Sequence, residues 1–146
     1  MLNLRNADED DQSFLYDILK ITMKEYYIEA FGSFEDEVEK EFFDDSFKNS
    51  EYFIVEFKNE EIGCVGIQKN KTHIFISEFL ILPECQNNGY GKMLYEYINS
   101  NFNKEKLPFH IEVLKVNEIA MNFFVKLGFS LESESKTHYL MNKNIK

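Results

Sequence analysis

The chain has 146 residues, of which 44% are apolar and 29% charged, with 15 Phe, 8 Tyr and no Trp. This length and mixture indicate one globular domain, residues 1–146, rather than a disordered chain. The formal net charge of −10 argues against nucleic acid and anionic membranes as partners, since both require clustered Lys and Arg. Such a field would attract a cationic substrate such as an amine, although the acidity can also serve solubility alone.

The first residues and the two cysteines bear on the location of the protein. The opening segment MLNLRNADED has no basic stretch followed by an apolar one, so we expect no signal peptide. No apolar run approaches the ~20 residues that span a bilayer. Cys64 and Cys85 are far apart and form no CxxC pattern. This pattern is most simply that of two reduced thiols in a cytoplasmic protein.

The N-terminal part of the chain is predicted to form a strand and two helices. Residues 1–7 have the character of a short strand, and the acidic residues 8–11 favour the start of a helix. Apolar residues at helical spacing predict that this first helix runs to about Ala30, before Gly32 interrupts it. A second helix, acidic on its outer face, is indicated by Phe34, Val38, Phe42 and Phe43.

Residues 51–82 show a different periodicity. Three runs rich in Phe, Ile and Val are separated by turn signals at residues 58–60 and 69–71. This spacing and composition are typical of a strand meander. The third strand is expected to cover about residues 72–82 and to end at Pro83.

The remaining chain alternates between helices and strands. A helix is predicted to begin near Gly89, residues 107–116 read as a strand covered on both faces, and residues 117–127 form a short helix capped by Asn117. Residues 129–143 complete the chain as two strands. The order β-α-α-β-β-β-α-β-α-β-β predicts a mixed α/β sheet. The buried face of the helix near Gly89 is expected to comprise Met93, Leu94, Tyr97 and Ile98.

A glycine-rich turn, QNNGYGKM at residues 86–93, separates the meander from that helix. Backbone N–H groups at such a turn, together with the first unpaired donors of the helix, form a site for an anion. Gly89 and Gly91 would allow a pyrophosphate to approach the backbone closely. Further contacts to phosphate can come from the side chains of Gln86, Asn87, Asn88 and Lys92.

The two glycines alone do not identify a ligand. A dinucleotide fingerprint needs a third glycine where Leu94 stands, and a P-loop needs other residues where Gln86 and Met93 stand. A turn that merely connects a strand to a helix, without a ligand, also remains possible on these residues. Cys85 lies beside the turn, but no His or Asp pattern supports an acyl-cysteine route, so we interpret it as structural.

Two motifs resemble those of a known family. Residues 79–98 resemble the acyl-CoA-binding motif of the Gcn5-related N-acetyltransferases, Q/R-x-x-G-x-G/A after a strand, with Gln86, Gly89 and Gly91 at the signature positions. Residues 117–129 are similar to the family's next motif, and the order of elements is also similar. The resemblance implies the family's fold, with splayed central strands, and acetyl-CoA as co-substrate. The matching positions of the second motif are Asn117, Ala120, Phe123, Gly128 and Phe129.

The resemblance also implies where acetyl-CoA lies. It is expected in the gap between the strand before the turn and the next parallel strand, with the backbone of Leu80 and Leu82 paired to the pantetheine arm. A backbone donor near Leu80 would polarise the thioester carbonyl. Asn117 faces the cofactor arm in related enzymes; here it can do so, act only as a helix cap, or do both. The pyrophosphate is expected on the N–H groups of Asn88, Gly89, Tyr90, Gly91 and Lys92.

Glu78 is the leading candidate for the general base. The expected chemistry is direct attack of an amine on the thioester, and an amine with a pKa near that of lysine, ~10.4, must lose a proton first. If strand alternation holds, Glu78, Leu80 and Leu82 share one face, although a bulge would shift that parity. A solvated carboxylate without a catalytic role is the alternative interpretation.

The chain departs from the family pattern at Phe124. Many members have a tyrosine there, which can give a proton to the departing CoA thiolate, and phenylalanine has no such proton. Tyr139 or another hydroxyl can substitute, water can protonate the thiolate, or the protein can be a poor catalyst. Tyr139 can equally well be an aromatic residue of the sheet.

The first two helices and the last hairpin usually select the acceptor in this fold. Here the helices carry aromatic and acidic side chains suited to a cationic amine, although a solvated acidic face accounts for them as well. A polyamine, amino sugar, peptide N-terminus or protein lysine remains open as the acceptor, and a homodimer is possible. The candidate acceptor residues are Tyr26, Tyr27, Glu29 and Phe31.

Two classes of function are consistent with the sequence. The three histidines and two cysteines show no spacing typical of metal ligands, so we expect no metal site. We therefore expect an N-acetyltransferase that moves an acetyl group from acetyl-CoA to a primary amine. The alternative is an acyl-CoA-binding module or sensor with little turnover, which would be consistent with Phe124.

Overall fold

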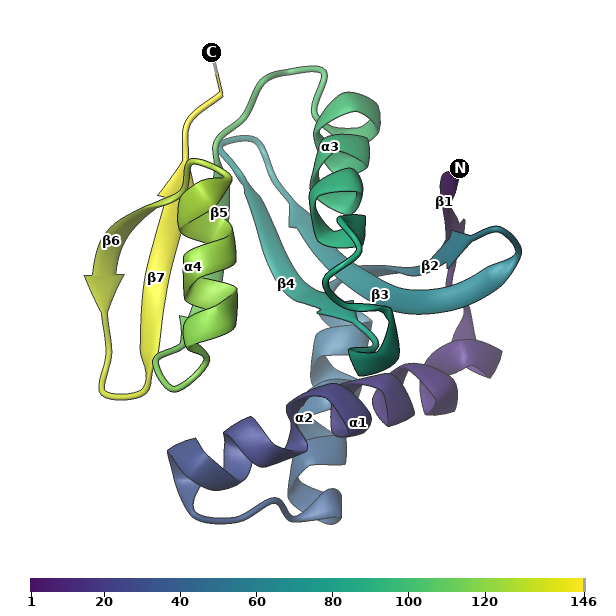
Figure 1. Cartoon of the computed structure of the whole chain (residues 1–146), viewed down its shortest axis with the longest axis vertical. Coiled ribbons are helices and arrows are strands. Elements are labelled where there is room, and N and C mark those ends of the chain that lie inside the picture. The colour runs from purple at the N-terminus through teal and green to yellow at the C-terminus, as the bar shows by residue number, and fades with distance from the viewer. Residues whose placement is uncertain (146) are drawn as a thin grey trace.

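The computed structural model describes residues 1–145 as seven strands, four α-helices and two short 3₁₀ turns (Figure 1). The strands are β1 (Leu2–Asn6), β2 (Glu51–Phe57), β3 (Glu60–Lys69), β4 (Ile74–Ile81), β5 (Phe109–Leu114), β6 (Ser130–Glu134) and β7 (His138–Lys143). The helices are α1 (Gln12–Phe31), α2 (Asp36–Asn49), α3 (Tyr90–Phe102) and α4 (Glu118–Lys126), and the 3₁₀ turns are η1 (Glu9–Asp11) and η2 (Pro83–Cys85).

The strands form one twisted sheet in the order β1-β2-β3-β4-β5-β7-β6. Every neighbouring pair is antiparallel except β4 and β5, which are parallel. Parallel neighbours need a crossover connection, and α3 provides it. The predicted mixed α/β sheet and its order of elements are therefore confirmed.

The sheet opens between β4 and β5. The two strands pair only over Ile74–Ile76 and Phe109–Ile111. Where this pairing ends, a bulge leaves Ser77 without a partner on β3, and the Ser77 hydroxyl lies 2.8 Å from the Ser50 hydroxyl. A bulge bends a strand and changes the face on which the following side chains lie. Beyond it β4 and β5 separate, as Figure 1 shows.

Helices cover both faces of the sheet, so the molecule has two apolar cores. One core lies under α3 and α4 and contains Ile74 and Ile76 from β4. The other lies under α1 and α2 and contains Leu80, with Leu82 packed against it. The β4 side chains thus change core across the bulge at Ser77, as its geometry requires.

Most predicted boundaries lie within two residues of the observed ones. The first helix ends at Phe31, where Gly32 adopts a left-handed φ of +89°. The predicted buried face of α3 is wrong at Met93, which is 36% exposed, whereas Tyr95 is buried instead. The strand β5 is also less covered than expected, since Glu112 is exposed.

Within the described residues, no helix is long and apolar enough to cross a membrane.

Candidate active site

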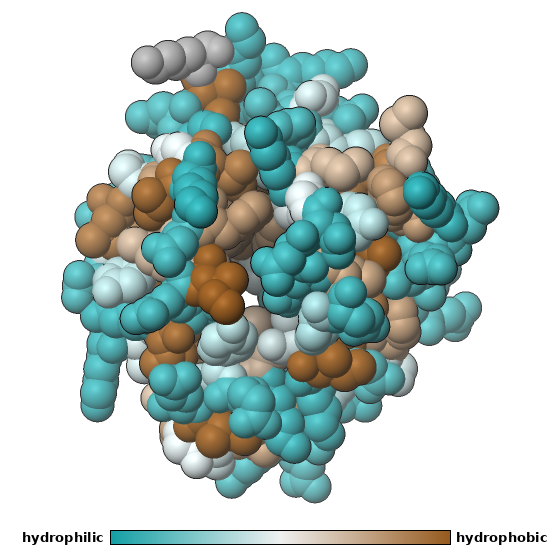
Figure 2. All heavy atoms as spheres, viewed as in Figure 1, coloured by the Kyte–Doolittle hydropathy of each residue, from teal (hydrophilic) through white to brown (hydrophobic). Residues whose placement is uncertain are grey.

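Two adjoining cavities occupy the region where β4 and β5 separate. The first, here called the turn cavity, has a volume of about 270 Å3 and is lined at one end by the glycine-rich turn. The second, the Glu78 cavity, has a volume of about 200 Å3. In the space-filling view the surface is mainly hydrophilic, with apolar side chains around a central hollow (Figure 2). The two cavities share six lining residues: Met23, Phe79, Leu80, Asn117, Ala120 and Phe124.

The two glycines of the turn are required for different reasons. Gly89 precedes α3 and has a left-handed φ of +79°, with no atom within 4 Å of the position of a Cβ. Its role is therefore conformational, since glycine adopts this φ without a steric cost. At Gly91, a Cβ would lie 2.8 Å from the Phe123 ring. Gly91 thus allows α3 to approach α4 across the cavity.

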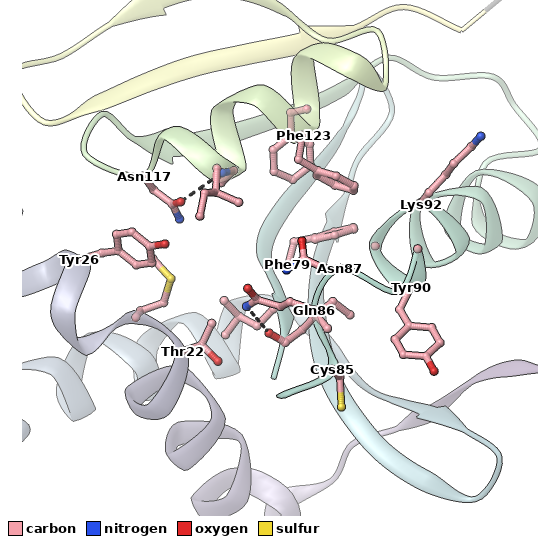
Figure 3. Close-up of a pocket in the computed structure, with 18 residues that line it drawn as sticks. Thr22, Tyr26, Phe79, Cys85, Gln86, Asn87, Tyr90, Lys92, Asn117 and Phe123 are labelled. Atoms are coloured by element: carbon pink, nitrogen blue, oxygen red, sulfur yellow. Dashed lines mark hydrogen bonds between the residues drawn. The ribbon is translucent and has the colours of Figure 1, made fainter. Parts of the chain in front are cut away.

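The polar side chains of the turn mostly stabilise the turn itself. The Gln86 side chain donates to the Ile81 carbonyl at 2.9 Å (Figure 3), and the Asn88 side chain donates to the carbonyls of Cys85 and Gln86, each at 3.1 Å. Asn88 does not line the turn cavity. The backbone N–H groups at the start of α3 remain as the candidate anion site, with Lys92 as an adjacent cation.

The backbone groups of β4 that face the gap differ from the expected ones. The Leu82 N–H donates to the Ile62 carbonyl at 2.8 Å, and a Cβ at Gly63 would collide with the Leu80 carbonyl oxygen. Both groups therefore point toward β3. The backbone N–H and C=O groups of successive residues in a strand point to opposite sides. The backbone groups of Phe79 and Ile81 therefore face the gap. The pairing with a pantetheine arm that was expected of Leu80 and Leu82 is therefore not open to these two groups, although the Leu80 side chain lines both cavities.

Asn117 caps α4 and also lines both cavities. Its side-chain oxygen accepts a hydrogen bond from the Ala120 N–H at 3.1 Å. The amide NH2 group has no partner among residues 1–145 and lies at the cavity (Figure 3). One side chain can thus provide the cap and a donor toward a ligand.

Glu78 lies in the wall of the second cavity, partly accessible to solvent. Its carboxyl group has no hydrogen bond or ion pair within the described chain, and burial raises its pKa to about 8. Burial penalises the charged form when no partner compensates for the lost water. The ionised form of this group can accept a proton from an amine, and it becomes the larger fraction above about pH 8.

The four candidate acceptor residues divide between cavity and surface. Tyr26 lines the turn cavity and Tyr27 the Glu78 cavity. Burial, together with the charge of Glu78, raises the pKa of Tyr27 above its usual range. Glu29 is exposed, and Phe31 is 52% exposed; neither lines a cavity.

Tyr139 is not brought to either cavity. It packs against the core under α3 and α4, and the Lys115 ammonium lies 5.3 Å from the centre of its ring. The preceding residue, His138, has the opposite orientation and lines the Glu78 cavity, because neighbouring side chains of a strand face opposite sides. Phe124, at the position of the usual tyrosine, is buried and lines both cavities.

Sequence reasoning missed several lining residues, chiefly apolar ones. Those on α1 and α4 belong to amphipathic helices, and Phe79 and Ile81 belong to the apolar strand before the turn. Neither pattern distinguishes a cavity wall from a core. Those in the turn cavity are Thr22, Met23, Phe79, Ile81, Ile119 and Phe123. No group of three or more His, Cys, Asp or Glu side chains within residues 1–145 is arranged to hold a metal ion.

Comparison with known proteins agrees with this geometry. A curated relative, spermidine N(1)-acetyltransferase of Escherichia coli K12, is 28% identical over 97% of this chain and 79% of its own length. The PaiA N-acetyltransferase of Thermoplasma acidophilum, solved with coenzyme A, superposes with a TM-score of 0.79 at 15% identity, over 99% of each chain. The ribosomal-protein-S18-alanine N-acetyltransferase of Escherichia coli superposes with a TM-score of 0.73 at 16% identity, over 100% of this chain and 95% of the other.

The family model described as "Acetyltransferase (GNAT) family" matches residues 15–129, from the first helix to the end of the second motif. This range includes the glycine-rich turn, Glu78 and Asn117. The chain therefore belongs to the GNAT family of acetyltransferases.

Proposed function

We propose that this protein transfers the acetyl group of acetyl-CoA to a primary amine of a small, linear polycation of the polyamine class. The observation that supports this most is the junction of the two cavities. The turn cavity begins at an anion site suited to a pyrophosphate, and it shares lining residues with the cavity that contains Glu78. An acyl donor and an amine that enter from the two sides would meet beside a carboxyl group that has no partner among residues 1–145.

Each group has a defined task in this proposal. Glu78 accepts a proton from the ammonium form of the acceptor, since only the neutral amine has a lone pair for attack. The N–H groups at the start of α3 bind phosphate. The backbone of Phe79 and Ile81 and the Asn117 amide hold the donor arm. The carbonyl carbon then gains a bond to nitrogen as its bond to sulfur breaks.

Three observations favour a polyamine as acceptor. The curated relative described above is named a spermidine N(1)-acetyltransferase. The net charge of −10 attracts a polycation. Tyr26 and Tyr27 add aromatic surface beside the cavities, where it can contact a cation.

The test is a calorimetric titration with acetyl-CoA, followed by thiol release with spermidine, amino sugars and short peptides. We expect acetyl-CoA to bind and spermidine to give the largest kcat/KM. If a peptide amine is preferred, the acceptor class is wrong but acetyl transfer stands. If acetyl-CoA does not bind, the proposal as a whole is wrong.

A second candidate is an acyl-CoA-binding module or sensor, and the observation that favours it is Phe124. This side chain lines both cavities without offering a proton. Tight binding of acetyl-CoA without thiol release from any tested amine would support this alternative.

We further propose that residues 1–146 act as one catalytic domain in the cytoplasm. The single continuous sheet supports one domain, and the two free cysteines support a cytoplasmic location. A homodimer through β6 is also proposed, since this edge strand is exposed along its length. Light scattering at several protein concentrations tests it.

A further inference from the structure

The departing CoA thiolate needs a proton, and the residues at the junction of the two cavities cannot provide one. The six shared lining residues include no hydroxyl, thiol or charged group. A proton donor supplied by the protein must therefore come from residues that line only one of the cavities. Apolar surroundings also raise the basicity of a thiolate, which increases the need for a donor.

Apart from Tyr26, the hydroxyl groups and acids that line the turn cavity are poorly suited to protonate the thiolate. Tyr90, Cys85 and Lys92 belong to the phosphate end, and the Tyr90 ring packs 4.8 Å from that of Phe57. Figure 3 shows Tyr90 and Lys92 on the opposite side of the cavity from Asn117. Thr22 has an aliphatic hydroxyl, which is a much weaker acid than a phenol.

The Glu78 cavity offers no better phenol. Tyr27 is stacked on Phe34 with ring centroids 5.7 Å apart and meets the edge of Phe31 at 5.9 Å. Burial and the charge of Glu78 raise the pKa of Tyr27, so this phenol gives up its proton less readily. Tyr139, on β7, faces away from both cavities.

Tyr26 has the required position. It lies one helical turn after Met23, a junction residue, on α1. Figure 3 shows its hydroxyl group directed into the turn cavity, at the same end as Asn117 and away from the phosphate turn. The hydroxyl has no hydrogen bond to any side chain or backbone group of residues 1–145, so it is free to donate.

We propose, on the basis of the acetyl-transfer function above, that Tyr26 is a catalytic residue that protonates the departing CoA sulfur. The ammonium nitrogen of the acceptor loses two protons in all, at least one of them to Glu78, as it bonds to the acetyl carbon. The C–S bond breaks, and the Tyr26 O–H proton passes to sulfur. The phenolate regains a proton from solvent, so one proton is released per turnover. Tyr26 thereby fills the role that Phe124 cannot perform.

The test compares Tyr26→Phe with the wild type and with Tyr97→Phe, which removes a tyrosine hydroxyl from α3 outside both cavities. We expect kcat of Tyr26→Phe to fall about 10²-fold, with the KM values for acetyl-CoA and spermidine within twofold of the wild type. The pH profile of kcat should also differ between Tyr26→Phe and the wild type. Tyr97→Phe should retain the wild-type kcat and its pH profile.

Three outcomes would overturn the inference. A kcat of Tyr26→Phe within twofold of the wild type removes the role altogether. A higher KM for spermidine with unchanged kcat makes Tyr26 an acceptor contact only. A lower kcat with a pH profile identical to that of the wild type indicates a structural role. Wild-type thiol release is measured first, because its absence with every amine would end both the proposed function and this inference.

Discussion

At the residue scale, Glu78 is the proposed general base, and burial is the cause of its raised pKa. Its carboxyl group has no partner in the described chain, and burial raises its pKa to about 8. Below that pH most of the carboxyl is protonated and cannot accept a proton. The catalytic rate should therefore increase with pH up to about 8, as far as this group is concerned.

We predict that Glu78→Gln lowers kcat roughly 10²-fold and removes the increase in rate up to pH 8. The variant keeps the size of the side chain but cannot take a proton. The measurement is kcat for spermidine as a function of pH. Glu96→Gln, a change at an exposed carboxylate on α3, is the control that should leave the profile intact. A Glu78→Gln profile identical to that of the wild type would show that Glu78 is not the base.

The same burial has a consequence for stability. Because the folded pKa of Glu78 lies above the ordinary value of 4.5, the folded state favours the protonated form. The free energy of unfolding is therefore lowered as pH rises from 4.5 through 8. We predict that Glu78→Gln is more stable than the wild type at pH 9, by an amount on the order of a few kcal/mol. Urea unfolding at pH 5 and pH 9 tests this, with a much larger difference expected at the higher pH.

At the element scale, the start of α3 depends on two glycines with separate tasks. Gly89 has the left-handed φ that begins the helix, and Gly91 gives room to Phe123. The effects of substitution should differ accordingly. A side chain at position 89 strains the backbone at the anion site, whereas one at position 91 displaces an aromatic ring of the cavity wall.

We predict that Gly89→Ala lowers the free energy of unfolding by about 1 kcal/mol and weakens acetyl-CoA binding about tenfold. Gly91→Val should weaken binding similarly with a smaller loss of stability, because the Phe123 side chain can move. Gly32→Ala is the matched control, since Gly32 also has a positive φ, +89°, and open space at its Cβ. It should lose similar stability and keep its affinity. Unchanged affinity in both variants of the turn would contradict the phosphate assignment.

At the scale of the whole molecule, the net charge of −10 acts on every ligand before contact. It attracts a polyamine and repels the phosphates of CoA. The proposed anion site at the start of α3 must therefore bind its ligand by short-range contacts. These are screened by salt much less than the long-range field, whose Debye length is about 10 Å at 0.1 M.

We predict that the KM for spermidine rises several-fold between about 0.02 M and 0.3 M NaCl, because salt screens the field. A monoamine acceptor should show a smaller increase, since it carries fewer charges. Initial rates at both salt concentrations provide the comparison. Equal salt dependence for the two acceptors would indicate that the overall charge does not contribute to selection.

Local sequence patterns were sufficient to predict the fold and the position of the glycine-rich turn. The order of elements follows from periodicity and turn residues, which act over a few positions. The turn at Gly89 and the helix capped by Asn117 are local in the same way, so both were found where the structure has them. The family match over residues 15–129 agrees with the resemblance drawn from those two motifs.

Which side chains meet depends instead on the tertiary structure. The bulge at Ser77 requires pairing with β3, and it sets the direction of every β4 group beyond it. The pKa of Glu78 depends on how completely distant segments bury it. Whether Tyr26 or Tyr139 lines a cavity depends on how α1 and β7 pack around the gap between β4 and β5. Burial and register arise from contacts between residues far apart in the chain, which local patterns do not encode.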